Sequence, residues 1–195
     1  MAKTRLGPTN LLYPTPTTLV GAVVDGKPNF LAIAWCGVVS SRPPMLSVSL
    51  QPHRYTLKGI VEHGVFSINI PSVAQVREAD YCGIRSGKDV DKVDVCGFDV
   101  FYGTLDKAPL ISQCPVNLEC HVEHTLELGM HHLIIGRVED THVSDECLTD
   151  GRPDVDKIDP FIFIQGARSR YQAFGEVIGK AFSIGLELEQ GEAGS

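Results

Sequence analysis

The sequence predicts a mainly β protein with a few short helices, closed or nearly closed into a barrel. Short apolar runs suited to strands follow one another at short spacing, and two pairs of them are joined by hairpin-turn residues. Only two segments carry helix start and stop signals. Closure into a barrel removes the unpaired strand edges that so many strands would otherwise expose.

Two hairpins give the strand assignment its clearest support. Residues 19–24 and 29–35 flank Asp25-Gly26, a dipeptide typical of tight hairpin turns. Residues 116–123 and 132–139 flank a turn at Gly129. Within 116–123 apolar and polar residues alternate, which predicts one buried face and one polar outer face that includes Asn117 and Glu119. Further strands are expected at 45–50, 65–70, 98–102 and 160–165.

The two helices are expected where side-chain caps precede an apolar run. Thr56 is a plausible N-cap of the first helix, which Gly64 would end. Ser72 and Gln75 have the spacing of a capping box at the start of the second helix, and Gly83 would follow that helix.

Composition bounds the class of protein. We expect a single domain at 1–188 and an acidic flexible tail at 189–195. The net charge of −7 among 195 residues argues against a nucleic-acid partner, which favours a basic face. No apolar stretch approaches the ~20 residues of a membrane span, and no apolar run follows the first residues, so we expect a cytoplasmic protein with no membrane partner.

The six cysteines are expected to be reduced thiols. The chain is too long to depend on disulfides, and it contains no Cys-x-x-Cys pair. Four histidines and two cysteines lie between Cys114 and His132, but their spacing matches no standard metal site. No metal is therefore expected.

Arg54, Tyr55 and Thr56 form a candidate anion site, because they lie where a strand gives way to a helix. Free N–H groups at the start of a helix attract anions, and an arginine adds two charge-assisted hydrogen bonds to a phosphate. Thr56 could instead serve only as the helix cap, although the two roles are compatible.

A flat ring could lie beside this anion site. Backbone groups of the small-residue segment after 29–35 can meet the edge of a planar ring, and Trp35, at the end of its strand, can pack against it. The alternatives are ordinary: Trp35 can be a core residue, and Asn29, after Pro28, can simply close its hairpin.

Four segments, taken in their order along the chain, resemble the flavin reductase-like split barrels that bind FMN, and among them the flavoredoxins. These segments are Asn29 to Trp35, Ser40 to Pro44, Leu46 to Leu50 and Arg54 to Thr56. The resemblance extends from about Leu11 to Tyr171. It implies an FMN-binding split β-barrel that acts as a homodimer and holds FMN noncovalently. Lys92 matches a lysine near the phosphate. Cofactor-binding residues are expected at Asn29, Trp35, Ser49, Arg54, Tyr55, Thr56, Ser86, Lys92, His131 and Phe163, with Phe161 as the alternative to Phe163.

Three functions remain open on this basis. The first is an FMN electron-transfer protein of the flavoredoxin type that carries electrons between redox partners. The second is an NAD(P)H-dependent flavin or ferric reductase. The third is a split-barrel binding module without redox activity. The flavin would carry the chemistry in the first two, so no catalytic side chain is expected.

Overall fold

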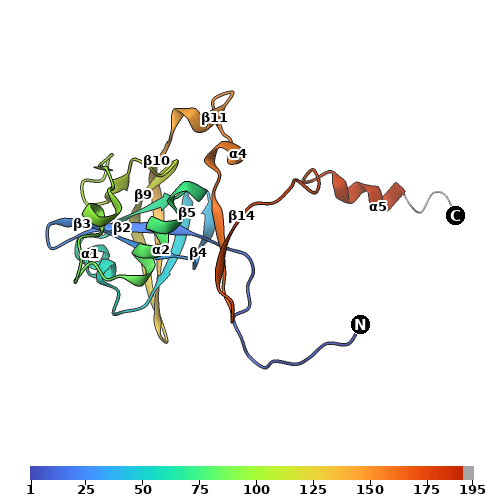
Figure 1. The fold of residues 1–195 in the computed structure, drawn as a ribbon, viewed down its shortest axis with the longest axis horizontal. Coiled ribbons are helices and arrows are strands. Elements are labelled where there is room, and N and C mark those ends of the chain that lie inside the picture. The colour runs from blue at the N-terminus through green and yellow to red at the C-terminus, as the bar shows by residue number, and fades with distance from the viewer. Residues whose placement is uncertain (191–195) are drawn as a thin grey trace.

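The computed structural model describes residues 1–190 and contains a seven-stranded antiparallel sheet that curls into a barrel (Figure 1). The strand order is β3-β2-β6-β9-β10-β5-β4. Its strands are β2 (Thr18–Val24), β3 (Lys27–Ile33), β4 (Cys36–Ser41), β5 (Pro44–Leu50), β6 (Val65–Ile70), β9 (Val116–Leu128) and β10 (His131–Val143). The backbone N–H of Ser49 donates to the carbonyl of Trp35 at 2.9 Å, which links the end of β3 to β5 and leaves β4 outside the closed part.

Three small sheets and several short helices surround the barrel. The small sheets pair β1 (Thr15–Pro16) with β13 (Phe161–Ile164) and β14 (Arg170–Ala173), β7 (Val100–Phe101) with β8 (Leu110–Ile111), and β11 (Leu148–Thr149) with β12 (Arg152–Pro153). The α-helices are α1 (Tyr55–His63), α2 (Val76–Ile84), α3 (Lys92–Cys96), α4 (Val155–Ile158) and α5 (Glu187–Gln190). The 3-10 turns are η1 (Val73–Gln75), η2 (Asp145–Cys147) and η3 (Ile184–Leu186). None of the helices in this described part of the chain is long and apolar enough to cross a membrane.

The barrel and the helical layer share strands β2 and β3. Inside the barrel, Leu57 and Ile60 of α1 pack against strand residues that include Phe66 and Ile134. On the outer face, Phe30 of β3 packs with Cys82 of α2 in a second core. Every residue of β2 is therefore buried, which explains why 19–24 reads as a continuous apolar run rather than an alternating one.

Several local predictions are confirmed by the backbone. The first hairpin turns at Asp25 and Gly26, which have φ angles of 51° and 78° as the tight turn requires. Gly64 ends α1 in the left-handed conformation. The Ser72–Gln75 capping box is formed, although it opens the 3-10 turn η1 rather than α2 directly.

Other local predictions are wrong. Arg54, not Thr56, occupies the N-cap position of α1. Gly83 lies within α2, which ends at Ile84. Asn117 and Glu119 were predicted to face outward, but both are buried beneath the segment 104–111 that crosses their face of β9.

The extent of some strands also differs from the prediction. The segment of small residues after Trp35 is the strand β4, which pairs with β5. The strand expected at 98–102 is reduced to the two residues of β7. Of the tail predicted at 189–195, residues 191–195 lie outside the described residues, and Gln190 ends α5.

Gly59 provides a test of how closely α1 packs on β2. A Cβ atom at Gly59 would collide with the backbone carbonyl of Val23. Alanine normally stabilises a helix interior relative to glycine by about 1 kcal/mol, whereas overpacking a core costs roughly 1–3 kcal/mol. We expect Gly59→Ala to lower the free energy of unfolding, measured by urea denaturation. Gly37→Ala, where the added atom meets open space, is the control, and a stabilised Gly59→Ala would contradict the packing described here.

Candidate functional site

A groove runs along β3 and continues past its end. It consists of three neighbouring hollows of about 230, 380 and 470 Å³. Arg54 lines both the first and the second hollow, and Ala34 lines both the second and the third, so each hollow shares a lining residue with the next. The floor changes along the strand from Asn29 and Leu31 at one end to Trp35 at the other.

The predicted binding residues gather at this groove. Nine of the ten line one of its hollows: Asn29, Trp35, Ser49, Arg54, Tyr55, Thr56, Ser86, Lys92 and Phe163. The tenth, His131, contacts Trp35, with 4.7 Å between ring centroids. A separate hollow of about 500 Å³ beside α2 and α3 contains none of them.

Polar side chains line the first hollow, and hydrogen bonds between wall residues hold them in place. The Nδ2 atom of Asn29 donates to Oγ1 of Thr56 at 2.7 Å, and both residues are buried. The Nζ atom of Lys92 donates to the carbonyls of Phe30 and Cys82 at 2.8 and 2.9 Å. Burial lowers the pKa of Lys92. Because a lysine ammonium has three N–H donors, one remains for a ligand.

The start of α1 opens onto the same hollow. Within residues 1–190, no side chain caps the free amides of its first turn, so they can bind an anion. The Nη1 atom of Arg54 lies 3.4 Å from the carbonyl of Gly83, a long contact that leaves the guanidinium free to bind more strongly elsewhere. The Tyr55 hydroxyl already donates to Asp25 at 2.8 Å, so Tyr55 offers its ring to the groove rather than its hydroxyl.

The far part of the groove is aromatic and apolar. Trp35 is 39% exposed and stacks at a tilt of 33° against His131. Phe163 lines the second hollow, whereas Phe161 is 3% exposed in the outer core, so Phe163 is the aromatic side chain available to a ligand. Ser49 lines the third hollow next to Trp35, whose carbonyl accepts a hydrogen bond from the Ser49 amide.

Sequence reasoning missed three residues of the second hollow. The hydroxyl of Tyr171 donates to Asp80 at 2.9 Å, and burial raises the pKa of Tyr171. Thr17 is 5% exposed, and its hydroxyl has no partner among the described residues. Tyr171 and Asp80 lie 91 positions apart, so no local pattern could have paired them; Thr17 gave no signal beyond its place beside a predicted strand.

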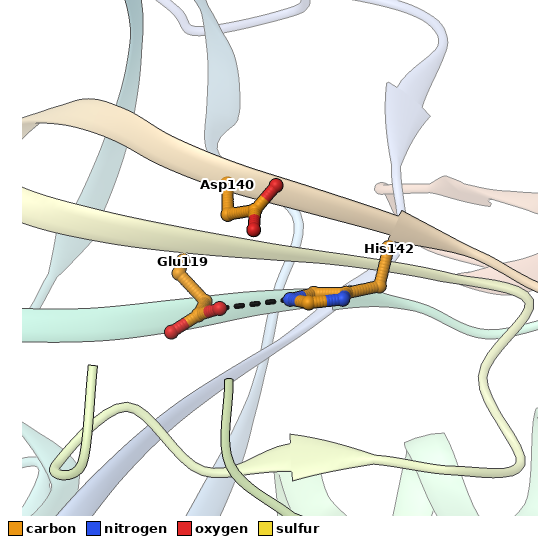
Figure 2. Close-up of side chains that lie close together, drawn as sticks. All are labelled: Glu119, Asp140 and His142. Atoms are coloured by element: carbon orange, nitrogen blue, oxygen red, sulfur yellow. Dashed lines mark hydrogen bonds and ion pairs between the residues drawn. The ribbon is translucent and has the colours of Figure 1, made fainter. Parts of the chain in front are cut away.

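Away from the groove, Glu119, Asp140 and His142 cluster on the outer face of β9 and β10 (Figure 2). Their ligand atoms lie within 4.8 Å of one another, as a bound cation would require. However, Glu119 already accepts hydrogen bonds from the amides of Thr104 and Leu105 at 3.0 and 2.5 Å, and it contacts Nε2 of His142 at 2.8 Å. The cluster is therefore explained as a clamp that fixes the 104–105 segment to the barrel.

Known proteins are similar to this chain in both sequence and fold. The model of the flavin reductase like domain matches residues 10–170. The crystal structure of flavoredoxin from Methanosarcina acetivorans is 38% identical, with a TM-score of 0.91 over 96% of this chain and 100% of that chain. The flavoredoxin of Desulfovibrio vulgaris (Miyazaki F) is 43% identical, with a TM-score of 0.87 over 94% and 100%. A flavin reductase of Pseudomonas putida is 27% identical over 136 residues, 69% of this chain and 76% of that protein.

The Glu119 clamp can be tested by removing its charge. Glu119→Gln replaces one acceptor oxygen with an NH2 group that faces N–H donors. Because a buried group left without its partners costs about 1–3 kcal/mol, and more where charge is involved, we expect a loss of roughly 3 kcal/mol in the free energy of unfolding. Glu123→Gln, an exposed residue of the same strand paired with Arg137, should have little effect. Equal losses in the two variants would contradict the clamp.

Proposed function

The chain belongs to the flavin reductase like domain family, and we propose that it is an FMN-binding redox protein of the flavoredoxin type that carries electrons between redox partners. The observation that carries this proposal is the shape and chemistry of the groove along β3. One end offers an arginine and free helix amides, and the other offers aromatic side chains. The solved relatives that are 38% and 43% identical are flavoredoxins, and they share this fold across almost their whole length.

The groove fits FMN in particular, because FMN has one phosphate at the end of a flexible polar chain and a flat ring at the other. Arg54 and the first turn of α1 form one compact anion site, at a hollow that Arg85 also lines, whereas a dinucleotide cofactor such as FAD would need to hold two phosphates. Thr17 supplies a buried hydroxyl that has no partner in the described part of the chain, at the second hollow, where a polar ring edge could satisfy it. Trp35, His131 and Phe163 supply the apolar surface for a ring.

FMN, when bound, supplies the ability to accept one or two electrons. The protein's own residues then bind, orient and shield. Arg54 and Ser86 hold the phosphate end, and Asn29 and Thr56 fix the polar wall through their mutual hydrogen bond. The remaining N–H of Lys92 brings a buried positive charge to the groove, which favours negative charge accumulating on a ligand during reduction. Trp35 and Phe163 keep water from the ring.

We further propose that the chain is a single domain that forms a homodimer in the cytoplasm. Residues from Thr17 to Tyr171 line the groove, which supports a single domain over residues 1–188. Strand β4 is an edge of the sheet and exposes Val38 and Val39, and the groove is open beside Trp35. A second copy covering this face would give a homodimer. The six cysteines are unpaired, which fits a reducing compartment such as the cytoplasm.

A second candidate function is an NAD(P)H-dependent flavin or ferric reductase. The similarity to the flavin reductase of Pseudomonas putida favours it. The third hollow, about 470 Å³ and beside Trp35, would leave space for a nicotinamide to approach the ring. The two functions differ in whether the reduced nicotinamide is the direct electron donor.

Purified protein should contain one FMN per chain. Heat-released cofactor identified by chromatography should be FMN, because the anion site at Arg54 and the first turn of α1 is compact; FAD at one per chain would overturn the assignment. Under anaerobic conditions, dithionite should bleach the flavin spectrum. Equally rapid bleaching by NADH or NADPH would favour the reductase over the electron carrier, and protein unable to bind any flavin would leave only a binding module without redox activity.

Arg54 and Lys92 should affect flavins differently. The family resemblance places Lys92 near the phosphate, but its Nζ atom donates to two backbone carbonyls and so fixes the groove wall. We therefore propose that Arg54 is the main phosphate contact. A charge-assisted hydrogen bond contributes roughly 1.5–3 kcal/mol, so Arg54→Ala should weaken FMN about tenfold to a hundredfold and riboflavin little. Lys92→Ala should weaken both and lower the melting temperature of the apoprotein. Fluorescence titration measures each affinity, and selective loss of FMN in Lys92→Ala would restore the original assignment.

A further inference from the structure

The C-terminal arm, defined here as residues 174–188, leaves the barrel after β14 and extends away from it (Figure 1). It is rich in exposed apolar side chains: Phe174, Val177, Ile178, Phe182, Ile184, Leu186 and Leu188. Ile178 is 95% exposed and Phe182 is fully exposed. Such a concentration of exposed apolar surface marks a site of protein association.

The same chain carries an apolar surface that could receive the arm. The third hollow of the groove is lined by Trp35, Leu133 and the prolines Pro14 and Pro16. Beside it, β4 exposes Val38 and Val39, and no strand of the described residues pairs with its outer side. An unpaired edge strand with exposed valines is a surface that another chain commonly covers.

The arm does not reach this surface within its own copy. In the small sheet, β1 borders the third hollow through Thr15 and Pro16, and β14 lies on the other side of β13. The arm therefore leaves on the side away from the hollow, and in Figure 1 it continues outward rather than back over the barrel. Its apolar side chains need a surface on another molecule.

We propose that the C-terminal arm of each copy lies across the third hollow and the β4 edge of a second copy, so that the partner's arm completes the wall of the groove beside Trp35. The inference deepens the proposed homodimer and rests on it. Because each copy contributes one arm and one receiving surface, a twofold exchange covers both arms and leaves neither surface open. A chain of a different protein would cover the arm but leave the hollow and β4 exposed.

Photo-crosslinking of the full-length apoprotein tests the exchange directly. A benzophenone amino acid is placed at Phe182, and copies labelled with light and heavy nitrogen are mixed before irradiation. We expect crosslinks from the arm to peptides that contain Trp35 or Val38, with light and heavy copies joined to each other. Crosslinks confined to one copy, or crosslinks to other surfaces of the barrel, would overturn the proposal.

Loss of the arm should expose both the interface and Trp35. The variants are a chain ending at Ala173 and the double variant Ile178→Asp with Phe182→Asp, and the control is Val61→Asp, at an exposed apolar residue of α1 outside the arm. Light scattering should show the dimer dissociation constant raised about a hundredfold or more in both arm variants but not in the control. Emission of Trp35, the only tryptophan in the chain, should shift to longer wavelength in the arm variants.

These measurements use apoprotein, so they do not depend on the flavin. A crosslinked dimer of the apoprotein that binds no FMN in a fluorescence titration would defeat the proposed cofactor and retain the exchange. A dimer of unchanged affinity and unchanged Trp35 emission after truncation would defeat the exchange and leave the FMN assignment intact. A wild-type protein that is monomeric at micromolar concentration would overturn both the homodimer and the arm exchange.

Discussion

The buried ammonium of Lys92 is the interaction on which the groove depends. Lys92 begins α3, and its Nζ atom donates to the carbonyl of Phe30 on β3 and to that of Cys82 on α2. One side chain thus joins the three elements that enclose the polar hollow. A charge removed from water must be hydrogen-bonded to be tolerated, so the two carbonyls stabilise the lysine as much as the lysine fixes them.

Strands β2 and β3 connect the groove wall to both cores of the molecule. β2 and β3 contribute one face to the barrel core and the other to the core beneath α2 and α3. Gly59 lets α1 approach the backbone of β2 closely, and this packing sets where the first turn of α1 opens. The position of the anion site is therefore a consequence of core packing rather than of the loop that contains it.

The groove combines two chemistries that the proposed cofactor would need together. Its polar end can hold an anion without a Gly-rich phosphate loop, and its aromatic end can cover a ring. On this view the side chains bind and shield, and they tune the charge of a ligand, while electron transfer belongs to the flavin. A ring beside Trp35 is fully shielded from water only when the third hollow is covered. The exposed arm of a second copy would provide that cover.

Residue order alone determined the features that depend on local chemistry: the turn at Asp25 and Gly26, the end of α1 at Gly64, and the strand 65–70. The set of residues that line the groove came from the family resemblance rather than from local chemistry. Tertiary structure decided which aromatic faces the groove, because Phe161 and Phe163 have equivalent positions in an alternating strand and only packing separates them. It also buried Asn117 and Glu119, because the segment 104–111 crosses their face of β9 and forms hydrogen bonds with both side chains. The alternation of apolar and polar residues within β9 does not reveal that crossing segment. Local sequence sets the conformation of a segment, but burial depends on what covers that segment, and that is settled only when the whole chain packs.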